Sequence, residues 1–183
     1  MNCKPTVLIV DDEAAIRDGL QRAFRAAPWT TQVAKDGESA IARLDAAPAA
    51  VLVTDESMPG MQGWELLDHV RAHHPSIIPI MLTGSASIGL AMRAINQGRV
   101  FRFLAKPSSS EEIADAIGAA LVHHRINHAL SSLLWLLRRE RSGANDPMPT
   151  APLPWLSTHA DTTALAERLE AEMQAACSRF RRS

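Results

Sequence analysis

The strongest constraint on the fold is an alternation of short apolar runs with amphipathic segments over residues 6–110. Each run is rich in Val, Ile or Leu and is bounded by polar or turn residues, a pattern typical of buried strands. Because helical spacing separates these runs, we expect a parallel sheet covered by helices on both faces, in a doubly wound α/β domain. The five predicted strands are Thr6–Val10, Thr30–Ala34, Val51–Thr54, Ile77–Leu82 and Phe101–Ala105.

Apolar residues at three- and four-residue spacing predict the helices between these strands. One such helix is expected over Ile88–Gln97, where Gly98 closes it, and a long helix begins near Ser110. Pro79 weakens the prediction of the fourth strand, because proline cannot donate to a sheet ladder.

Polar side chains follow four of the predicted strands at the point where each strand ends. The carboxyl edges of neighbouring parallel strands line one crevice, so these groups should meet there. Clustered carboxylates repel one another and need a cation, and hard oxygen ligands with open positions suit Mg²⁺. A hydroxyl and an ammonium group beside that metal would suit phosphoryl oxygens. The groups are Asp11 and Asp12 after the first strand, Asp55 after the third, Thr83 at the fourth and Lys106 at the fifth.

This set of motifs resembles the receiver domain of two-component response regulators. The resemblance covers roughly residues 5–125, about two thirds of the chain, and implies a flavodoxin-like, five-stranded parallel sheet in the order 2-1-3-4-5. The motifs that carry it are Asp11-Asp12, Asp55 followed by Met58-Pro59-Gly60-Met61-Gln62-Gly63, Thr83-Gly84-Ser85 and Lys106-Pro107.

The resemblance implies a chemical role for each matching residue. Asp55 would accept a phosphoryl group from a partner sensor histidine kinase or phosphotransfer protein. Asp12 would bind Mg²⁺ directly and Asp11 would hold the waters of the metal. The backbone carbonyl of Ser57 would be a further protein ligand beside Asp55.

The same resemblance implies a switch. Lys106 would pair with Asp55 and then with its phosphoryl group, while the Thr83 hydroxyl would move onto a phosphoryl oxygen and Phe103 would follow it inward. Ser57 and Ser85 flank the reaction centre and are expected to tune the rate of dephosphorylation.

Some residues depart from the usual pattern of the family. Glu56 adds an acid beside Asp55, Gln62 stands where an acid is common, and Trp64 is bulky for the start of its helix. The segment Ser108–Ser110 is also unusual after the Lys-Pro pair. None of these departures removes a group needed for phosphorylation.

The C-terminal third differs in composition from the rest of the chain. The last receiver helix should run on to about Arg141, and its cluster Leu133–Leu137 is too apolar for a solvent-exposed helix. Two interpretations stay open, a homodimer through residues 126–141 or intramolecular cover by a final helix. The expected organisation is a receiver domain at 1–125, a helical extension at 126–141, a Pro-rich linker at 142–160 and an amphipathic helix at 161–183.

Charge and hydropathy exclude several classes of partner. The 19 Lys and Arg residues nearly balance the 20 Asp and Glu residues, and no segment has the basic excess that binds DNA or anionic lipid. No apolar stretch approaches the ~20 residues of a membrane span. We therefore expect a cytoplasmic protein with neither nucleic-acid nor membrane partners.

The sequence predicts a response regulator whose output is a change of contacts with a downstream protein. It would catalyse only its own phosphorylation and dephosphorylation. Two alternatives stay open, an enzyme that uses Asp55 as a phosphotransferase or phosphatase nucleophile, and a phosphate sink without an effector. The helical pairs His69/His73 and His124/His128 lack an obvious third ligand, so we interpret them as solvated surface residues, not as a zinc site.

Overall fold

A computed structural model describes residues 4–84 and 100–142, with side chains described as far as Leu133. The chain divides into two compact units, residues 1–121 and 122–183, and the sheet lies in the first. The elements are β1 (Thr6–Val10), α1 (Ala14–Ala23), β2 (Thr30–Ala34), α2 (Gly37–Ala46), β3 (Val51–Asp55), α3 (Gly63–His73), β4 (Ile78–Thr83), β5 (Arg102–Ala105) and α5 (Ser110–Ser142).

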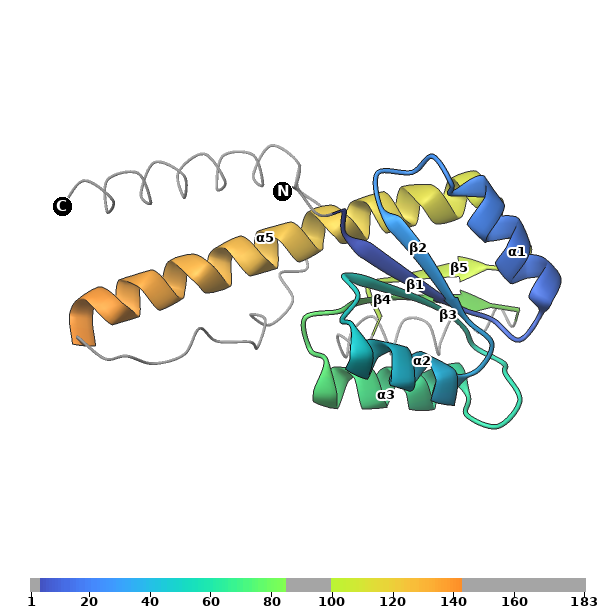
Figure 1. Ribbon diagram of the computed structural model, residues 1–183, viewed down its shortest axis with the longest axis horizontal. Coiled ribbons are helices and arrows are strands. Elements are labelled where there is room, and N and C mark those ends of the chain that lie inside the picture. The colour runs from blue at the N-terminus through green and yellow to red at the C-terminus, as the bar shows by residue number, and fades with distance from the viewer. Residues whose placement is uncertain (1–3, 85–99, 143–183) are drawn as a thin grey trace. The chain divides into compact units, whose positions relative to one another are not determined.

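The five strands form one parallel sheet in the order β2-β1-β3-β4-β5, as expected (Figure 1). Its central strands are mostly apolar because both faces are covered, and every residue of β3 is buried, including the polar Thr54 and Asp55 at its end. Four boundaries in three strands differ from the prediction by one residue each: β3 extends to Asp55, β4 begins at Ile78 and ends at Thr83, and β5 begins at Arg102.

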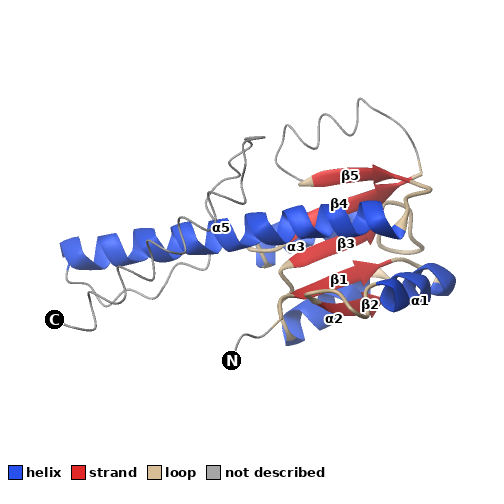
Figure 2. Ribbon diagram, turned by 90° about the horizontal axis from the view of Figure 1, so that it is seen from above, coloured by secondary structure: helices blue, strands red, loops and turns tan. Residues whose placement is uncertain are grey.

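Helices cover both faces of the sheet (Figures 1 and 2). The first helix, α1, and the start of α5 lie on one face, and α2 and α3 lie on the other. The core on the second face contains Leu8, Leu52 and Leu66, with Trp64 and Phe103 packed against its margin.

Pro79 is tolerated inside β4 because of its position. The preceding N–H, of Ile78, donates to Ala50 on the β3 side at 3.0 Å, so the missing N–H of Pro79 falls on the side of β5. On that side the Pro79 carbonyl accepts from the Phe101 N–H at 2.8 Å, and the register with β5 begins one residue later, with Ile80 opposite Arg102. The proline therefore stands at the start of the β4–β5 pairing, and the ladder between β4 and β3 does not need its N–H.

The segment after Lys106-Pro107 starts α5. Ser109 Oγ accepts from the Glu112 N–H at 3.1 Å, and Glu112 Oε2 accepts from the Ser109 N–H at 2.9 Å. This reciprocal capping box explains the unusual serine segment as a helix start. It defines the N-terminus of α5.

The long C-terminal helix is present, since α5 is continuous for 33 residues. In the part of the chain that the structure describes, no helix is long and apolar enough to cross a membrane. Several predictions lie outside the described residues: Ser85, the helix over 88–97, the linker after Ser142 and the final helix at 161–183. The domain boundaries stay predictions.

Candidate functional site

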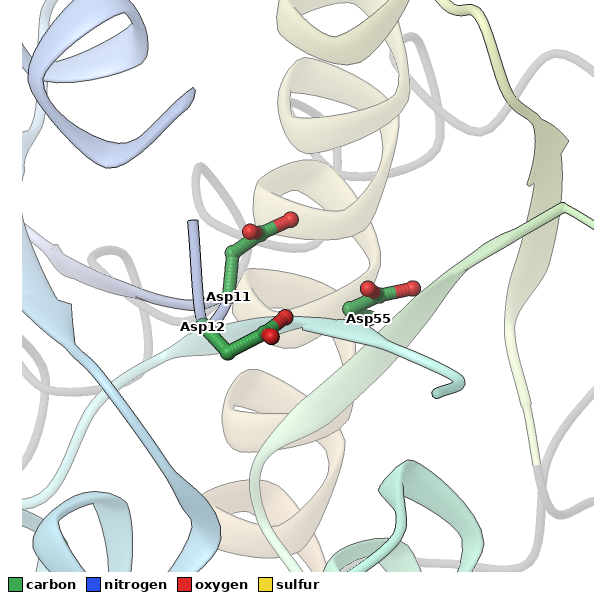
Figure 3. A group of neighbouring side chains, drawn as sticks. All are labelled: Asp11, Asp12 and Asp55. Atoms are coloured by element: carbon green, nitrogen blue, oxygen red, sulfur yellow. The ribbon is translucent and has the colours of Figure 1, made fainter. Parts of the chain in front are cut away.

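Three aspartates meet at the carboxyl edge of the sheet. Asp11 and Asp12 follow β1 directly, and Asp55 is the last residue of β3, the strand that pairs with β1. One carboxylate oxygen from each lies within 4.8 Å of the others (Figure 3). Asp11 is fully buried and Asp55 is 5% exposed, whereas Asp12 faces solvent. The cluster lies where the strand order reverses, which is where open α/β sheets bind ligands.

The buried carboxylate of Asp11 is held on both of its oxygens. Its Oδ1 accepts from the Glu13 N–H at 2.9 Å, and its Oδ2 accepts from Lys106 Nζ at 3.1 Å. The Arg17 guanidinium binds its backbone carbonyl at 2.7 Å. These bonds compensate the cost of burying a charge and fix the turn between β1 and α1.

Lys106 brings an ammonium group into the aspartate cluster. Its Nζ lies 2.8 Å from Asp55 Oδ2 and 3.1 Å from Asp11 Oδ2, and its backbone N–H donates to the Thr83 carbonyl at 2.8 Å. Burial alone would lower the pKa of Lys106, but the hydrogen bonds and charges of Asp55 and Asp11 outweigh it and raise that pKa above its ordinary value. The lysine is therefore cationic at neutral pH.

One ammonium group does not neutralise three carboxylates. The cluster thus retains a local negative charge at a partly open edge of the sheet. The oxygens of these carboxylates are hard metal ligands, and Asp12, which carries one of them, is exposed. Both properties are typical of a Mg²⁺ site that keeps waters for a phosphate. The residues present fit the metal that the sequence predicts.

The backbone around Asp55 is fixed by the start of α3. The Gly63 N–H donates to the Glu56 carbonyl at 3.0 Å, and a Cβ on Gly63 would lie 2.2 Å from the Asp55 carbonyl oxygen. Only glycine permits this approach of helix and strand end. Ser57, an exposed residue, donates its N–H to Asp55 Oδ1 at 3.4 Å.

The predicted switch residues Thr83 and Phe103 lie on neighbouring strands. The Thr83 hydroxyl donates to Glu56 Oε2, and Phe103 packs against Trp64 with ring centroids 5.7 Å apart. Sequence reasoning singled out Glu56 and Trp64 as departures but missed these contacts. Glu56 and Thr83 lie 27 positions apart in the sequence, and Trp64 and Phe103 lie 39 positions apart, so no local pattern signals either contact.

The interpretation of the histidines as solvated is correct for His73 and His128, which are exposed, but not for His69 and His124, which are partly buried. Burial first, and then the charges of His128 and His123, lower the pKa of His124 to about 4. His124 is therefore not a solvated surface residue. The rings of His69 and His73 stack at 4.2 Å.

The fold and this site define an α/β protein of the flavodoxin-like type with an acidic, lysine-bearing ligand edge. The chain belongs to the response regulator receiver domain family, whose family model matches residues 7–118. It therefore contains a receiver domain of the kind found in two-component response regulators, and the family expectation from the sequence is confirmed.

Similar proteins include longer regulators. The C4-dicarboxylate transport transcriptional regulatory protein DctD of Rhizobium meliloti is 29% identical over 81% of this chain and 31% of its own length. The DNA-binding transcriptional regulator NtrC of Salmonella typhimurium is 33% identical over 65% of this chain and 25% of its own. The chain thus spans about a third or less of these two relatives.

A solved receiver domain has the same fold. The signal receiver domain of an HD domain-containing protein from Pseudomonas fluorescens Pf-5 is 30% identical, with a TM-score of 0.64 over 70% of this chain and 94% of that one.

NtrC is named as DNA-binding, which stands against our expectation of no nucleic-acid partner, although the match covers only a quarter of that protein. That expectation stays a prediction.

Proposed function

We propose that Asp55 accepts a phosphoryl group from a phosphohistidine of a partner kinase or phosphotransfer protein, in a reaction that requires Mg²⁺. The observation that carries this proposal is the approach of Lys106 Nζ to Asp55 Oδ2, at 2.8 Å, inside a cluster of three carboxylates. The nucleophile, a cation that can follow it and a set of metal ligands thus share one edge of the sheet.

The chemistry is a transfer between two nucleophiles. The bond from phosphorus to the histidine nitrogen breaks as a bond to a carboxylate oxygen of Asp55 forms, and the histidine keeps the electron pair. Asp11, Asp12 and the Ser57 carbonyl would hold Mg²⁺, which would supply neutralising charge to the phosphoryl oxygens. Lys106, already beside the nucleophile, would follow the charge onto the phosphoryl group.

The chain would act as a switch and not as an enzyme on other substrates. A phosphatase built on Asp55 would need a second acid two residues later as general acid, and Ser57 stands there. Thr83 would then move onto a phosphoryl oxygen with Phe103 following, and Ser57 and Ser85 would tune the lifetime of the phosphoryl group.

The output would be a change of protein contacts in the cytoplasm, without DNA or membrane binding. A homodimer through residues 126–141 and intramolecular cover of that segment both stay proposals. Asn127 of this segment is 7% exposed and accepts, through its carbonyl, from Ser131 Oγ at 2.8 Å.

Labelling with a kinase or a small phosphodonor separates these functions. We expect intact mass to show one phosphoryl group per chain, only with Mg²⁺, and none in Asp55→Asn. Label that saturates supports the switch, whereas continued turnover of a phosphoester supports the enzyme. Equal labelling of Asp55→Asn would overturn the assignment of the acceptor.

A further inference from the structure

The carboxylate of Glu56 joins two side chains that the proposed function does not connect. Its Oε2 accepts from the Thr83 hydroxyl, and its Oε1 accepts from Trp64 Nε1 at 3.2 Å. Glu56 directly follows Asp55, and its side chain is partly buried. A partly buried carboxylate with two donors has a defined position.

The backbone of Glu56 is equally fixed. Its N–H donates to the Leu82 carbonyl at 2.9 Å, and its carbonyl accepts from the Gly63 N–H at 3.0 Å. Glu56 is thus tied to β4 on one side and to α3 on the other. A carboxylate held in this way fixes the donors that it binds.

The Thr83 hydroxyl has a single proton to donate. In this structure the proton goes to Glu56, whereas the proposed function requires it at a phosphoryl oxygen on Asp55. The two acceptors therefore compete for one donor. Phosphorylation also places more negative charge on the residue next to Glu56, and like charges at this range repel.

The second donor extends the connection to the aromatic residue of the switch. The ring of Trp64 contacts that of Phe103 at a centroid distance of 5.7 Å and an interplanar angle of 41°, and both side chains are partly buried at the margin of the core. A change at the Glu56 carboxylate therefore reaches Phe103 through one intervening ring.

We propose that Glu56 is a positioning residue that holds Thr83 away from Asp55 in the unphosphorylated protein, and that Trp64 couples the release of Thr83 from Glu56 to Phe103. The inference rests on the proposed phosphorylation of Asp55. The contacts that hold Thr83 stabilise only one of two packings, so they oppose the population shift that phosphorylation produces. Removing them pre-organises the phosphorylated packing.

The test is a double-mutant cycle on the binding of beryllofluoride, a phosphoryl mimic, in the presence of Mg²⁺. We expect Glu56→Ala to tighten binding about ten-fold, the factor that corresponds to the lower end for a hydrogen bond to a charged group. Part of any gain comes from removing a negative charge, so the same substitution is made in Thr83→Ala. There we expect the gain to fall to two-fold or less.

Two further variants separate the hydrogen bonds from charge and packing. Trp64→Phe keeps a ring against Phe103 but removes the indole donor. We expect its affinity for beryllofluoride to lie between that of wild type and that of Glu56→Ala. Asp18→Asn removes an exposed carboxylate on α1 that takes no part in the site, and we expect at most a two-fold change. The indole N–H resonance of Trp64, identified by its loss in Trp64→Phe, should shift with beryllofluoride in wild type but not in Glu56→Ala.

The outcomes are distinguishable. An equal gain for Glu56→Ala with and without Thr83 would overturn the inference and leave the proposed function intact, because Glu56 would then act only through its charge. A Trp64 resonance that does not respond in wild type would overturn the coupling to Phe103. Failure of wild type to bind beryllofluoride with Mg²⁺ would overturn the proposed function, and the inference with it.

Discussion

Replacing Asp12 by Asn should stabilise the metal-free protein while abolishing its response to Mg²⁺. The substitution keeps the shape of the side chain and removes one of three negative charges that lie within 4.8 Å of one another. Lys106 pairs with the other two aspartates, so most of its attraction is retained in the variant.

The magnitude follows from Coulomb's law. Two unit charges 4.8 Å apart repel by about 3.5 kcal/mol at an effective dielectric constant of 20 and by about 0.9 kcal/mol in water. Asp12 is exposed while Asp11 and Asp55 are buried, so each repulsion lies between these limits, and the attraction of Lys106 offsets part of the sum. We expect a net gain of about 1–3 kcal/mol in the free energy of unfolding.

Urea denaturation with and without millimolar MgCl₂ measures both effects. Wild type should gain stability with Mg²⁺, because a ligand that binds only the folded state shifts the equilibrium toward it, and Asp12→Asn should gain little. Asp18→Asn, which removes an exposed aspartate on α1, is the matched control and should behave as wild type. A variant that is less stable than wild type without Mg²⁺, or equally stabilised by it, would refute the reasoning.

Three other predictions use the same assays. Gly63→Ala should cost about 1–3 kcal/mol and slow phosphorylation, because its Cβ would displace the Asp55 backbone, and unchanged stability would contradict the close approach. Lys106→Met should cost about 3 kcal/mol without Mg²⁺, since it leaves the carboxylates of Asp55 and Asp11 without their cation, and an unchanged urea midpoint would argue against the ion pairs. The pKa of His124, lowered by burial to about 4, lies below its unfolded value, so unfolding takes up a proton between about pH 4 and 6.5. Stability should fall as pH falls through that window, by at most about 1.4 kcal/mol per pH unit, and His124→Gln should flatten the dependence, whereas a slope equal to that of wild type would exclude the group.

The sequence predicts the sheet and the aspartate cluster for one physical reason. Buried parallel strands require continuous apolar runs, and the polar residue that ends each run marks the carboxyl edge. Asp11 and Asp55 end adjacent strands and therefore meet, whatever the details of the loops. The order of the strands came from the family resemblance and not from the runs themselves.

The contacts of Glu56 could not be predicted in this way. Its donors, Trp64 and Thr83, come from α3 and β4, and their approach depends on how closely α3 packs against the end of β3. That packing depends in turn on Gly63, whose role is visible only once the Asp55 carbonyl is placed beside it. Side-chain partners across elements follow from tertiary packing, which no single periodicity encodes.

The burial of His124 was missed for a related reason. Two histidines four residues apart on a long helix predict only a shared face, and they do not say whether that face is covered. In the structure His128 is exposed while His124 is partly buried, so the pair is split between two environments.

Mapping the phosphorylated residue tests the central claim most directly. Borohydride reduces an acyl phosphate on aspartate to homoserine, so peptide mass spectrometry after labelling and reduction locates the acceptor. We predict homoserine at position 55 alone, dependent on Mg²⁺ and accompanied by unmodified Asp11 and Asp12. Modification at Asp12, at Glu56 or at a histidine, with Asp55 unmodified, would contradict the account.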